Sequence, residues 1–307
     1  MKKVIFVVGA TASGKSDWAL RLAEEFHGVI INCDSVQVYK YLEIGAAKAT
    51  QEERARVPHY LIDYVAPPNE MTAGIYGRDF NECLKSLPDD KPIFVVGGTG
   101  FYFMAIEKGM YPVIPVPPEI QKQILEEMKE EGGPERLHQE MMAADPVYGA
   151  KIAKADHYRI GRALELIRSQ KKSVTQIQAN FEASREKFPH DLLKIGPEWD
   201  RETLRERIRQ RTAKMIEQGL IEEVQGLIEK GLDLSWAPLA SVGYKETLQF
   251  VRGEITKEQL QDEITINTQQ LAKKQKTWFQ KDREINWFPG DKGFDQARAL
   301  VEKFLTS

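Results

Sequence analysis

Residues 9–16 read GATASGKS and follow directly on the apolar run VIFVV that starts at Val4. They fit the pattern G-x-x-x-x-G-K-[ST], and a helical pattern through Trp18 and Leu22 comes next. Such a loop surrounds phosphate oxygens with backbone N–H groups and the positive end of a helix, so the stretch predicts a diphosphate or triphosphate site. The predicted diphosphate-binding residues are Gly9, Thr11, Ala12, Ser13, Gly14, Lys15 and Ser16, with Lys15 as the cation and Ser16 as the Mg²⁺ ligand.

Short runs of β-branched and aromatic residues recur along the chain. They start at Val4, Val29, Tyr60, Ile93, Leu192 and Ile285. The first four are almost wholly apolar and are separated by helical or loop-like stretches, which is typical of a parallel sheet with helices on both faces. Together with the phosphate loop, this alternation predicts an α/β fold with a P-loop NTPase-like parallel sheet flanked by helices.

The stretch from about Pro112 to Lys187 has a different pattern. It opens with the proline-rich PVIPVPP, its apolar residues keep helical spacing from Ile120 to Met128, and no strand pattern returns before Leu192. We therefore expect three segments. Residues 1–111 form the first part of the core, residues 112–187 a helical insertion domain, and residues 188–307 the second part of the core with basic C-terminal helices.

Composition excludes several classes of protein. The 307 residues include 43 Lys or Arg and 46 Asp or Glu, a net charge of −3, so contact with a polyanion requires a local basic patch. Two cysteines and five scattered histidines argue against a disulfide framework and a zinc enzyme. No run reaches the roughly 18 apolar residues of a membrane helix, and no signal-peptide pattern is present. We expect a cytoplasmic protein without a membrane partner.

Two polar segments follow buried-type strands, at the edge of the sheet where open α/β folds bind ligands. The stretch DSVQ, from Asp34 to Gln37, follows VIIN, and Thr99 lies in GGTG after IFVV. A carboxylate here could accept a proton from an amino group while an amide binds a base edge and a hydroxyl binds phosphate. The pattern is equally consistent with a helix cap at Asp34, a solvent-facing Gln37 and a packing turn at Thr99.

An arginine-rich helix is predicted from RETLRERIRQR, with Asp200 as its N-cap. Arg207 and Arg211 lie one helical turn apart, so one or both could reach a diphosphate from the side opposite Lys15. A solvated face is the alternative for any single arginine of this helix.

A second basic helix, predicted to begin at Thr256 with Gln259 completing a capping box, ends in LAKKQKTWFQKDR. Basic residues next to Trp278 suit a nucleic-acid backbone with stacking bases. However, Trp278 also continues an apolar stripe at helical spacing, which favours a place in the core. The other members of the stripe are Leu260, Ile264 and Leu271.

These motifs jointly resemble the tRNA dimethylallyltransferase family, also called tRNA isopentenyltransferases. The matching strings run in order from residue 9 to residue 279: GATASGKS, DSVQVY with IGAAKAT, PHYLID, VGGTGFY, RALEL, RIRQRTAKMIEQGLIEEV, SVGYKE and LAKKQKTWF. The chain departs from the family's common residues at Ala10, Glu43, Ala46 and Gln280, and the departure at Gln280 weakens a phosphate contact there.

The resemblance implies transfer of a dimethylallyl group from its diphosphate to the exocyclic amine of the adenosine 3′ of the anticodon in tRNA, with Mg²⁺ assisting. It implies Asp34 as general base, and Thr99 and Arg211 as diphosphate ligands beside Lys15 and Ser16. The predicted catalytic residues are therefore Asp34, Thr99, Arg211 and Lys15. We expect a monomer that binds the anticodon stem-loop. The implied tRNA contacts are Asp34, Ser35, Val36, Gln37, Tyr158, Arg159, Arg162, Ser241, Gly243, Tyr244, Lys245, Lys273, Lys274, Gln275, Thr277 and Trp278.

Three other functions are weighed against this one. A P-loop kinase of a small metabolite would use the same loop for ATP and Asp34 for Mg²⁺, but it leaves the insertion and the basic helix without a role. A prenyltransferase acting on free adenine nucleotides would modify AMP but not an anticodon stem-loop. A non-catalytic RNA-binding module would not need the phosphate loop.

Overall fold

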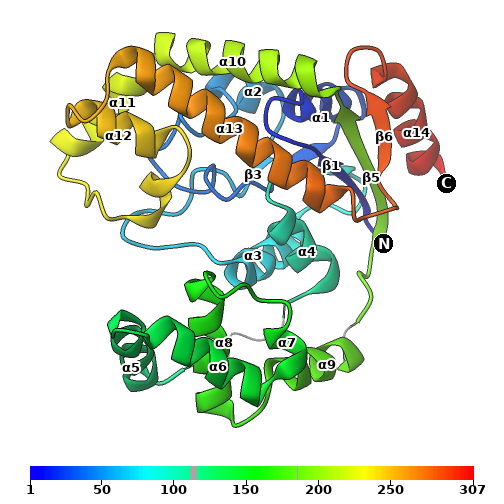
Figure 1. The fold of residues 1–307 in the computed structure, drawn as a ribbon. Coiled ribbons are helices and arrows are strands. Elements are labelled where there is room, and N and C mark those ends of the chain that lie inside the picture. The colour runs from blue at the N-terminus through cyan, green and yellow to red at the C-terminus, as the bar shows by residue number, and fades with distance from the viewer. Residues whose placement is uncertain (111–115, 185) are drawn as a thin grey trace. The chain divides into compact units, whose positions relative to one another are not determined.

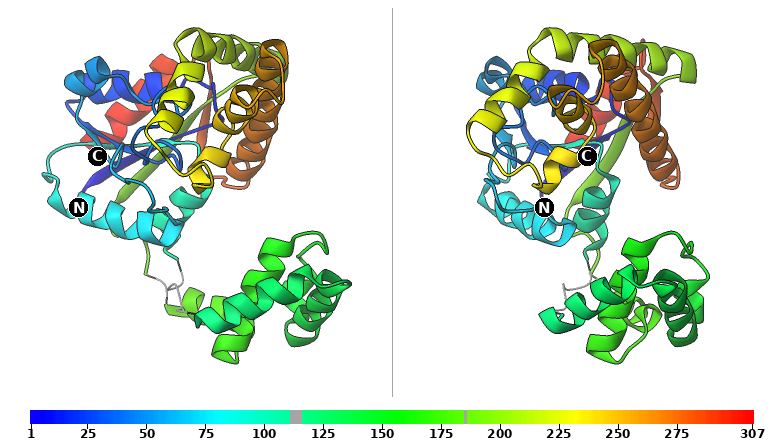
Figure 2. Two further views of the ribbon diagram at one scale, coloured as in Figure 1. Left: turned by 90° about the vertical axis from the view of Figure 1, so that its left-hand side faces the viewer. Right: turned by 60° about the vertical axis from the view of Figure 1, so that its left-hand side comes forward.

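The computed structural model describes residues 1–110, 116–184 and 186–307 (Figure 1). The chain divides into two compact units, Met1–Glu107 with Phe188–Ser307, and Lys108–Lys187. Figure 2 shows the ribbon from two further sides. The proline-rich start predicted for the insertion at Pro112 falls in residues 111–115, outside the described residues.

The first unit contains a six-stranded sheet in the order β3-β2-β4-β1-β5-β6, with every neighbouring pair parallel. The strands are β1 (Lys3–Val8), β2 (Val29–Asn32), β3 (His59–Tyr60), β4 (Ile93–Gly97), β5 (Asp191–Glu198) and β6 (Asn286–Pro289). Successive side chains of a strand point to opposite faces. Ile5 and Val7 accordingly join one apolar cluster, whereas Phe6 contacts Phe103, with ring centroids 4.9 Å apart. The predicted α/β fold is confirmed.

Helices cover both faces of this sheet (Figures 1 and 2). Those of the first unit are α1 (Lys15–Glu25), α2 (Gln51–Arg56), α3 (Ala73–Ser86), α4 (Gly100–Lys108), α10 (Arg201–Glu217), α11 (Leu220–Glu229), the 3₁₀ helix η1 (Ala237–Ala240), α12 (Tyr244–Val251), α13 (Lys257–Phe279) and α14 (Phe294–Thr306). Helices α1 and α14 pack on the face that carries Ile5 and Val7. Helix α4 packs on the face that carries Phe6.

Strand β3 is shorter than the sequence predicts. The run YLIDY from Tyr60 suggests a strand of several residues, yet pairing with β2 stops at Tyr60. Leu61 and Asp63 have φ angles of 53° and 58°, in the left-handed region that a strand cannot contain. The Asp63 carboxylate instead accepts a hydrogen bond from the Lys48 ammonium at 2.7 Å, so a long-range contact overrides the local β propensity.

Both predicted N-caps are confirmed. The Asp200 carboxylate accepts from the Thr203 N–H at 2.9 Å at the start of α10, and Thr256 forms a capping box with Gln259 at the start of α13. The apolar stripe of α13 is only partly buried. Its first half lies in the core, but Leu271 and Trp278 are 37% and 41% exposed, so the interpretation of Trp278 as a core residue is wrong.

Among its described residues, the second unit contains helices joined by turns and no strand. Its helices are α5 (Pro118–Lys129), α6 (Gly133–Ala144), α7 (Pro146–Gly149), α8 (His157–Gln170) and α9 (Val174–Ser184). They enclose a core of their own around Leu137, Met141 and Leu164. Arg168 of α8 ties α5 and α6 together through the Glu127 and Glu140 carboxylates. Within the described ranges, no helix has the length and hydropathy needed to cross a membrane.

Candidate active site

The phosphate loop joins β1 to α1 and contains a tight turn. Gly14 has a φ of 89°, a left-handed conformation that favours glycine, and it directly precedes the first turn of α1. The Ser13 N–H donates to the Ala10 carbonyl at 3.2 Å, and the Lys15 ammonium donates to the same carbonyl at 3.2 Å. The sequence pattern therefore folds into the local geometry that binds phosphate groups.

Helix α10 holds this loop from a distant part of the chain. The Arg211 guanidinium donates to the Thr11 hydroxyl at 2.8 Å, and the Arg207 Nε donates to the Ala12 carbonyl at 2.9 Å. Trp199, just before α10, donates from its indole N–H to the Ser13 carbonyl at 2.8 Å. Arg207 and Arg211 thus lie at the loop rather than on a solvated face.

Two cations at this site are poorly solvated. Burial lowers the pKa of Lys15 to about 8; the Asp34 carboxylate opposes this shift and Arg211 adds to it. Burial also lowers the pKa of the Arg211 guanidinium, again with Asp34 acting in the opposite direction. An anion that binds beside desolvated positive charges is stabilised by them. Lys15 and Arg211 therefore favour a diphosphate ligand.

Asp34 lies in a turn directly after β2, and its position is set by backbone groups. One carboxylate oxygen, Oδ1, accepts from the Val36 N–H at 2.9 Å and from the Gln37 N–H at 3.4 Å. Within the described part of the chain, Oδ2 accepts no hydrogen bond, which leaves it for a ligand. The turn resembles a cap, but no helix follows it.

Thr99 fixes the same turn from the short connection between β4 and α4. Its hydroxyl accepts from the Ser35 N–H at 2.9 Å and donates to the Ser35 hydroxyl at 3.2 Å. Gly97 allows the strands to approach, because a Cβ there would lie 1.8 Å from the Cys33 carbonyl oxygen. In this structure Thr99 therefore orients the Asp34 turn, and the hydroxyl predicted to bind phosphate is occupied by Ser35.

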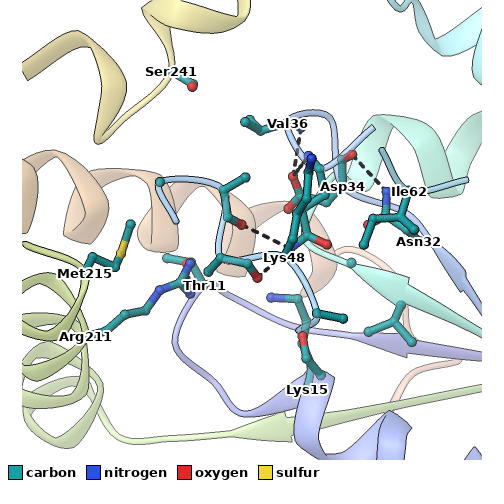
Figure 3. Close-up of a pocket in the computed structure, with 18 of the residues that line it drawn as sticks. Thr11, Lys15, Asn32, Asp34, Val36, Lys48, Ile62, Arg211, Met215 and Ser241 are labelled. Atoms are coloured by element: carbon teal, nitrogen blue, oxygen red, sulfur yellow. Dashed lines mark hydrogen bonds between the residues drawn. The ribbon is translucent and has the colours of Figure 1, made fainter. Parts of the chain in front are cut away.

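A cavity of about 310 Å³ brings these groups together. Figure 3 shows Lys15, Thr11 and Arg211 around this cavity together with Asp34. The apolar side chains that line it are Leu20, Ile30, Val36, Ile62, Val96, Met215, Val242, Ile264 and Leu271. A cavity with a cationic loop, a carboxylate and apolar walls fits a ligand that carries both phosphates and a hydrocarbon group.

The loop of residues 43–49 lines this cavity and also a second, more open one of about 870 Å³. Glu223 of α11 holds the loop by accepting from the backbone N–H groups of Glu43, Ile44 and Gly45 at 3.2, 2.7 and 3.3 Å. The Tyr244 hydroxyl donates to Glu223 at 2.6 Å and accepts from the Ala46 N–H.

Two exposed aromatic side chains meet on the surface formed by α4 and α13. Phe101 is 46% and Trp278 41% exposed, and their rings pack edge to face with centroids 6.2 Å apart. Trp278 covers Gly100, where a Cβ would lie 2.1 Å from the indole. Lys273, Lys274 and Thr277 on the same helix are exposed.

Comparison with known proteins gives the family of this chain. The family model for IPP transferase matches residues 37–282. A tRNA dimethylallyltransferase of Bdellovibrio bacteriovorus is 68% identical over 99% of this chain and 98% of the relative, and one from Synechocystis is 40% identical over 97% and 95%. This chain belongs to the IPP transferase family. The predicted family is confirmed.

Solved structures show the same fold for this IPP transferase family member. The full-length tRNA isopentenylpyrophosphate transferase from Bacillus halodurans has a TM-score of 0.72 and 28% identity, covering 100% of this chain and 97% of that one. A eukaryotic dimethylallyltransferase solved acting on tRNA has a TM-score of 0.84, 24% identity and coverage of 100% and 80%. At that identity the second likeness shows the fold alone.

The structure places the predicted tRNA contacts of this family member in different surroundings. Lys245, Lys273, Lys274, Thr277 and Trp278 are exposed, and Ser241 lines the smaller cavity. In the second unit, Tyr158 and Arg159 are exposed on α8, and Arg162 pairs with Glu165.

Two of these predictions need correction. Tyr244 is fully buried, and its hydroxyl is bonded to Glu223 and to the Ala46 N–H, so its side chain has no surface to offer RNA. Gly243 is also buried, and its N–H donates to the Glu246 carboxylate. Both residues shape the loop of residues 43–49 and the start of α12 instead.

Sequence reasoning missed Glu223, Trp199 and Phe101. Glu223 looks like an ordinary first-turn acid of a helix, and Trp199 like a residue that ends a strand. Phe101 carried no local signal either, because the two aromatic residues that follow it, Tyr102 and Phe103, are buried.

Proposed function

We propose that the protein transfers a dimethylallyl group from dimethylallyl diphosphate to the N6 amine of the adenosine that follows the anticodon of tRNA, releasing diphosphate. The prediction of a tRNA dimethylallyltransferase is confirmed at the level of the family, because relatives with this name cover nearly the whole chain. One observation carries the proposal: Lys15, Arg211 and Asp34 line the same cavity, together with apolar side chains.

The cationic side of the cavity suits the leaving group. Breaking the bond between C1 of the allyl group and the diphosphate oxygen leaves negative charge on the diphosphate. The Lys15 ammonium, the Arg211 guanidinium and the amides of the phosphate loop are placed to neutralise it. Their desolvation makes this interaction stronger than it would be in water.

The Asp34 side suits the nucleophile. The N6 amine of adenine is a weak nucleophile because its lone pair is delocalised into the ring, and it must lose a proton as the new C–N bond forms. The unoccupied Oδ2 of Asp34 is the acceptor that we assign to this proton, and general-base catalysis of this kind contributes about 10²- to 10⁴-fold.

The residues of the site also fit Mg²⁺. Ser16 offers a hydroxyl at the end of the loop and lines the same cavity as Lys15. Mg²⁺ prefers oxygen ligands and is usually held by one or two protein groups together with substrate phosphates. When bound, the ion would withdraw charge from the leaving diphosphate.

We assign the RNA to the exposed cations of α13 and to Tyr158, Arg159 and Arg162 of the helical insertion, which would act as a clamp. The target adenosine must leave its stack to reach the phosphate loop, and this costs less in a single-stranded anticodon loop than in a duplex. A monomeric state and a cytoplasmic location stay predictions.

A substrate panel tests the proposed function. The protein is incubated with radiolabelled dimethylallyl diphosphate or with ATP, and with an anticodon stem-loop or free AMP as acceptor. We expect label to enter the stem-loop only, and the Lys15→Ala variant to lose this activity. Consumption of ATP would favour the kinase, labelled AMP the nucleotide prenyltransferase, and RNA binding without transfer the non-catalytic module.

A further inference from the structure

The side-chain amide of Gln275 joins two halves of the site that are far apart in sequence. Its Oε1 accepts from the Thr11 N–H of the phosphate loop at 2.8 Å, and its Nε2 donates to the Gly98 carbonyl at 3.0 Å. The two partners fix the orientation of the amide, because a backbone N–H requires the oxygen and a carbonyl requires the nitrogen.

Each partner of Gln275 leads to one of the reacting groups. Thr11 also receives the Arg211 guanidinium on its hydroxyl, so it belongs to the diphosphate side of the cavity. Gly98 precedes Thr99, whose hydroxyl holds the Ser35 N–H next to Asp34. The Gln275 amide therefore links the part of the site that binds diphosphate to the part that holds Asp34.

The close approach at Gly98 shows how tight this link is. A Cβ at Gly98 would lie 2.4 Å from the Gln275 nitrogen, so the residue must be glycine for the hydrogen bond to form. Gln275 is half-buried, whereas its neighbours Lys273, Lys274 and Thr277 are exposed. The helix thus turns its basic side chains outward and this amide toward the active site.

We propose that Gln275 is a positioning residue that holds the diphosphate cradle and the Asp34 turn in register, rather than a contact to RNA. This inference rests on the proposed function. Transfer requires C1 of the donor, the N6 amine and the carboxylate to line up, and a displacement of about 1 Å can cost about 10²-fold in rate. Gln275 acts on that alignment through its hydrogen bonds to Thr11 and Gly98.

Two variants break the link from opposite ends. Gln275→Met keeps the size of the side chain and removes both hydrogen bonds. Gly98→Ala keeps the glutamine but displaces its side-chain amide, because the added Cβ would lie too close to it. We expect the single-turnover rate at saturating substrates to fall about 10²-fold in each. The Kd values for dimethylallyl diphosphate and for the anticodon stem-loop should remain close to wild type. The double variant should lose little more than either single one, because both remove the same link.

Gln270→Met is the matched control, because Gln270 is an exposed glutamine on the same helix. Its rate should equal that of the wild type. Weakened RNA binding with an unchanged rate at saturation would overturn the proposal and make Gln275 an RNA contact. Multiplying losses in the double variant would overturn it as well.

Hydrogen exchange provides a readout that does not depend on activity. In Gln275→Met the amides of residues 9–16 and 97–100 should exchange faster than in the wild type, with a melting temperature close to it. Unchanged exchange in both segments would contradict the link. A wild-type protein that shows the link in exchange but transfers no prenyl group would contradict the proposed function alone.

Discussion

The Lys15 ammonium titrates near neutrality because burial lowers its pKa from 10.5 to about 8. As pH rises through about 8, a growing fraction of Lys15 in the free protein is neutral and no longer attracts phosphate. We therefore expect the affinity for dimethylallyl diphosphate to fall over this range, measured by calorimetry across a pH series. The Lys15→Met variant should bind weakly at every pH. A wild-type affinity that rises above pH 8 would show that another group controls binding.

The same pKa shift has the opposite sign for stability. Between about 8 and 10.5 the unfolded chain binds more protons at Lys15 than the folded chain does. The Lys15 contribution to the free energy of unfolding therefore increases with pH in this window. As pH rises, ligand affinity falls while this contribution to stability increases. Both effects have the same cause, because the folded protein disfavours the charged form of Lys15.

Asp34 and Lys15 are assigned to different steps, so their variants should fail differently. Asp34→Asn keeps the shape of the side chain and removes the base, and we expect kcat to fall by about 10²- to 10⁴-fold with donor affinity retained. Lys15→Ala should chiefly raise the Kd for the donor. Steady-state kinetics and direct binding measure the two effects. Equal loss of donor affinity in both variants would mean that the roles are misassigned.

At the scale of elements, the loop of residues 43–49 depends on α11. Glu223 accepts three backbone N–H groups of this loop, and Glu223→Leu would leave them without that partner. We expect the free energy of unfolding to fall by about 1–3 kcal/mol, together with weaker donor binding. Urea denaturation measures the change. Glu222→Leu is the control, because Glu222 is exposed one residue away and should have little effect.

The elements differ in how far sequence could predict them. The caps at Asp200 and Thr256 were predictable because they depend on residues three positions apart. The phosphate loop was predictable because strand, glycines and helix follow one another. The bonds of Gln275 and Glu223 were not, since their partners lie 264 and 179 residues away and only the fold brings them together. Periodicity likewise placed Trp278 in the core, but at this end α13 buries Ala272 and Phe279 instead.

At the scale of the whole molecule, a net charge of −3 opposes binding to a polyanion, so affinity for RNA must come from the local distribution of cations. Each phosphate that a lysine or arginine neutralises releases counterions, which makes log K fall linearly with log salt. We expect a steep salt dependence for the anticodon stem-loop. The Lys273→Gln/Lys274→Gln double variant should flatten the slope by about 1 to 2, since each contact to a single strand contributes about 0.7.

The control for this experiment removes one positive charge elsewhere on the chain. Lys303 is exposed on α14, which packs on the other face of the sheet from α4. Lys303→Gln should shift neither the slope nor the affinity at moderate salt, measured by filter binding. If it flattens the slope as much per lysine as the α13 variant does, then net charge rather than a basic surface on α13 governs the encounter with RNA. A wild-type slope near zero would show that phosphate contacts contribute little to binding.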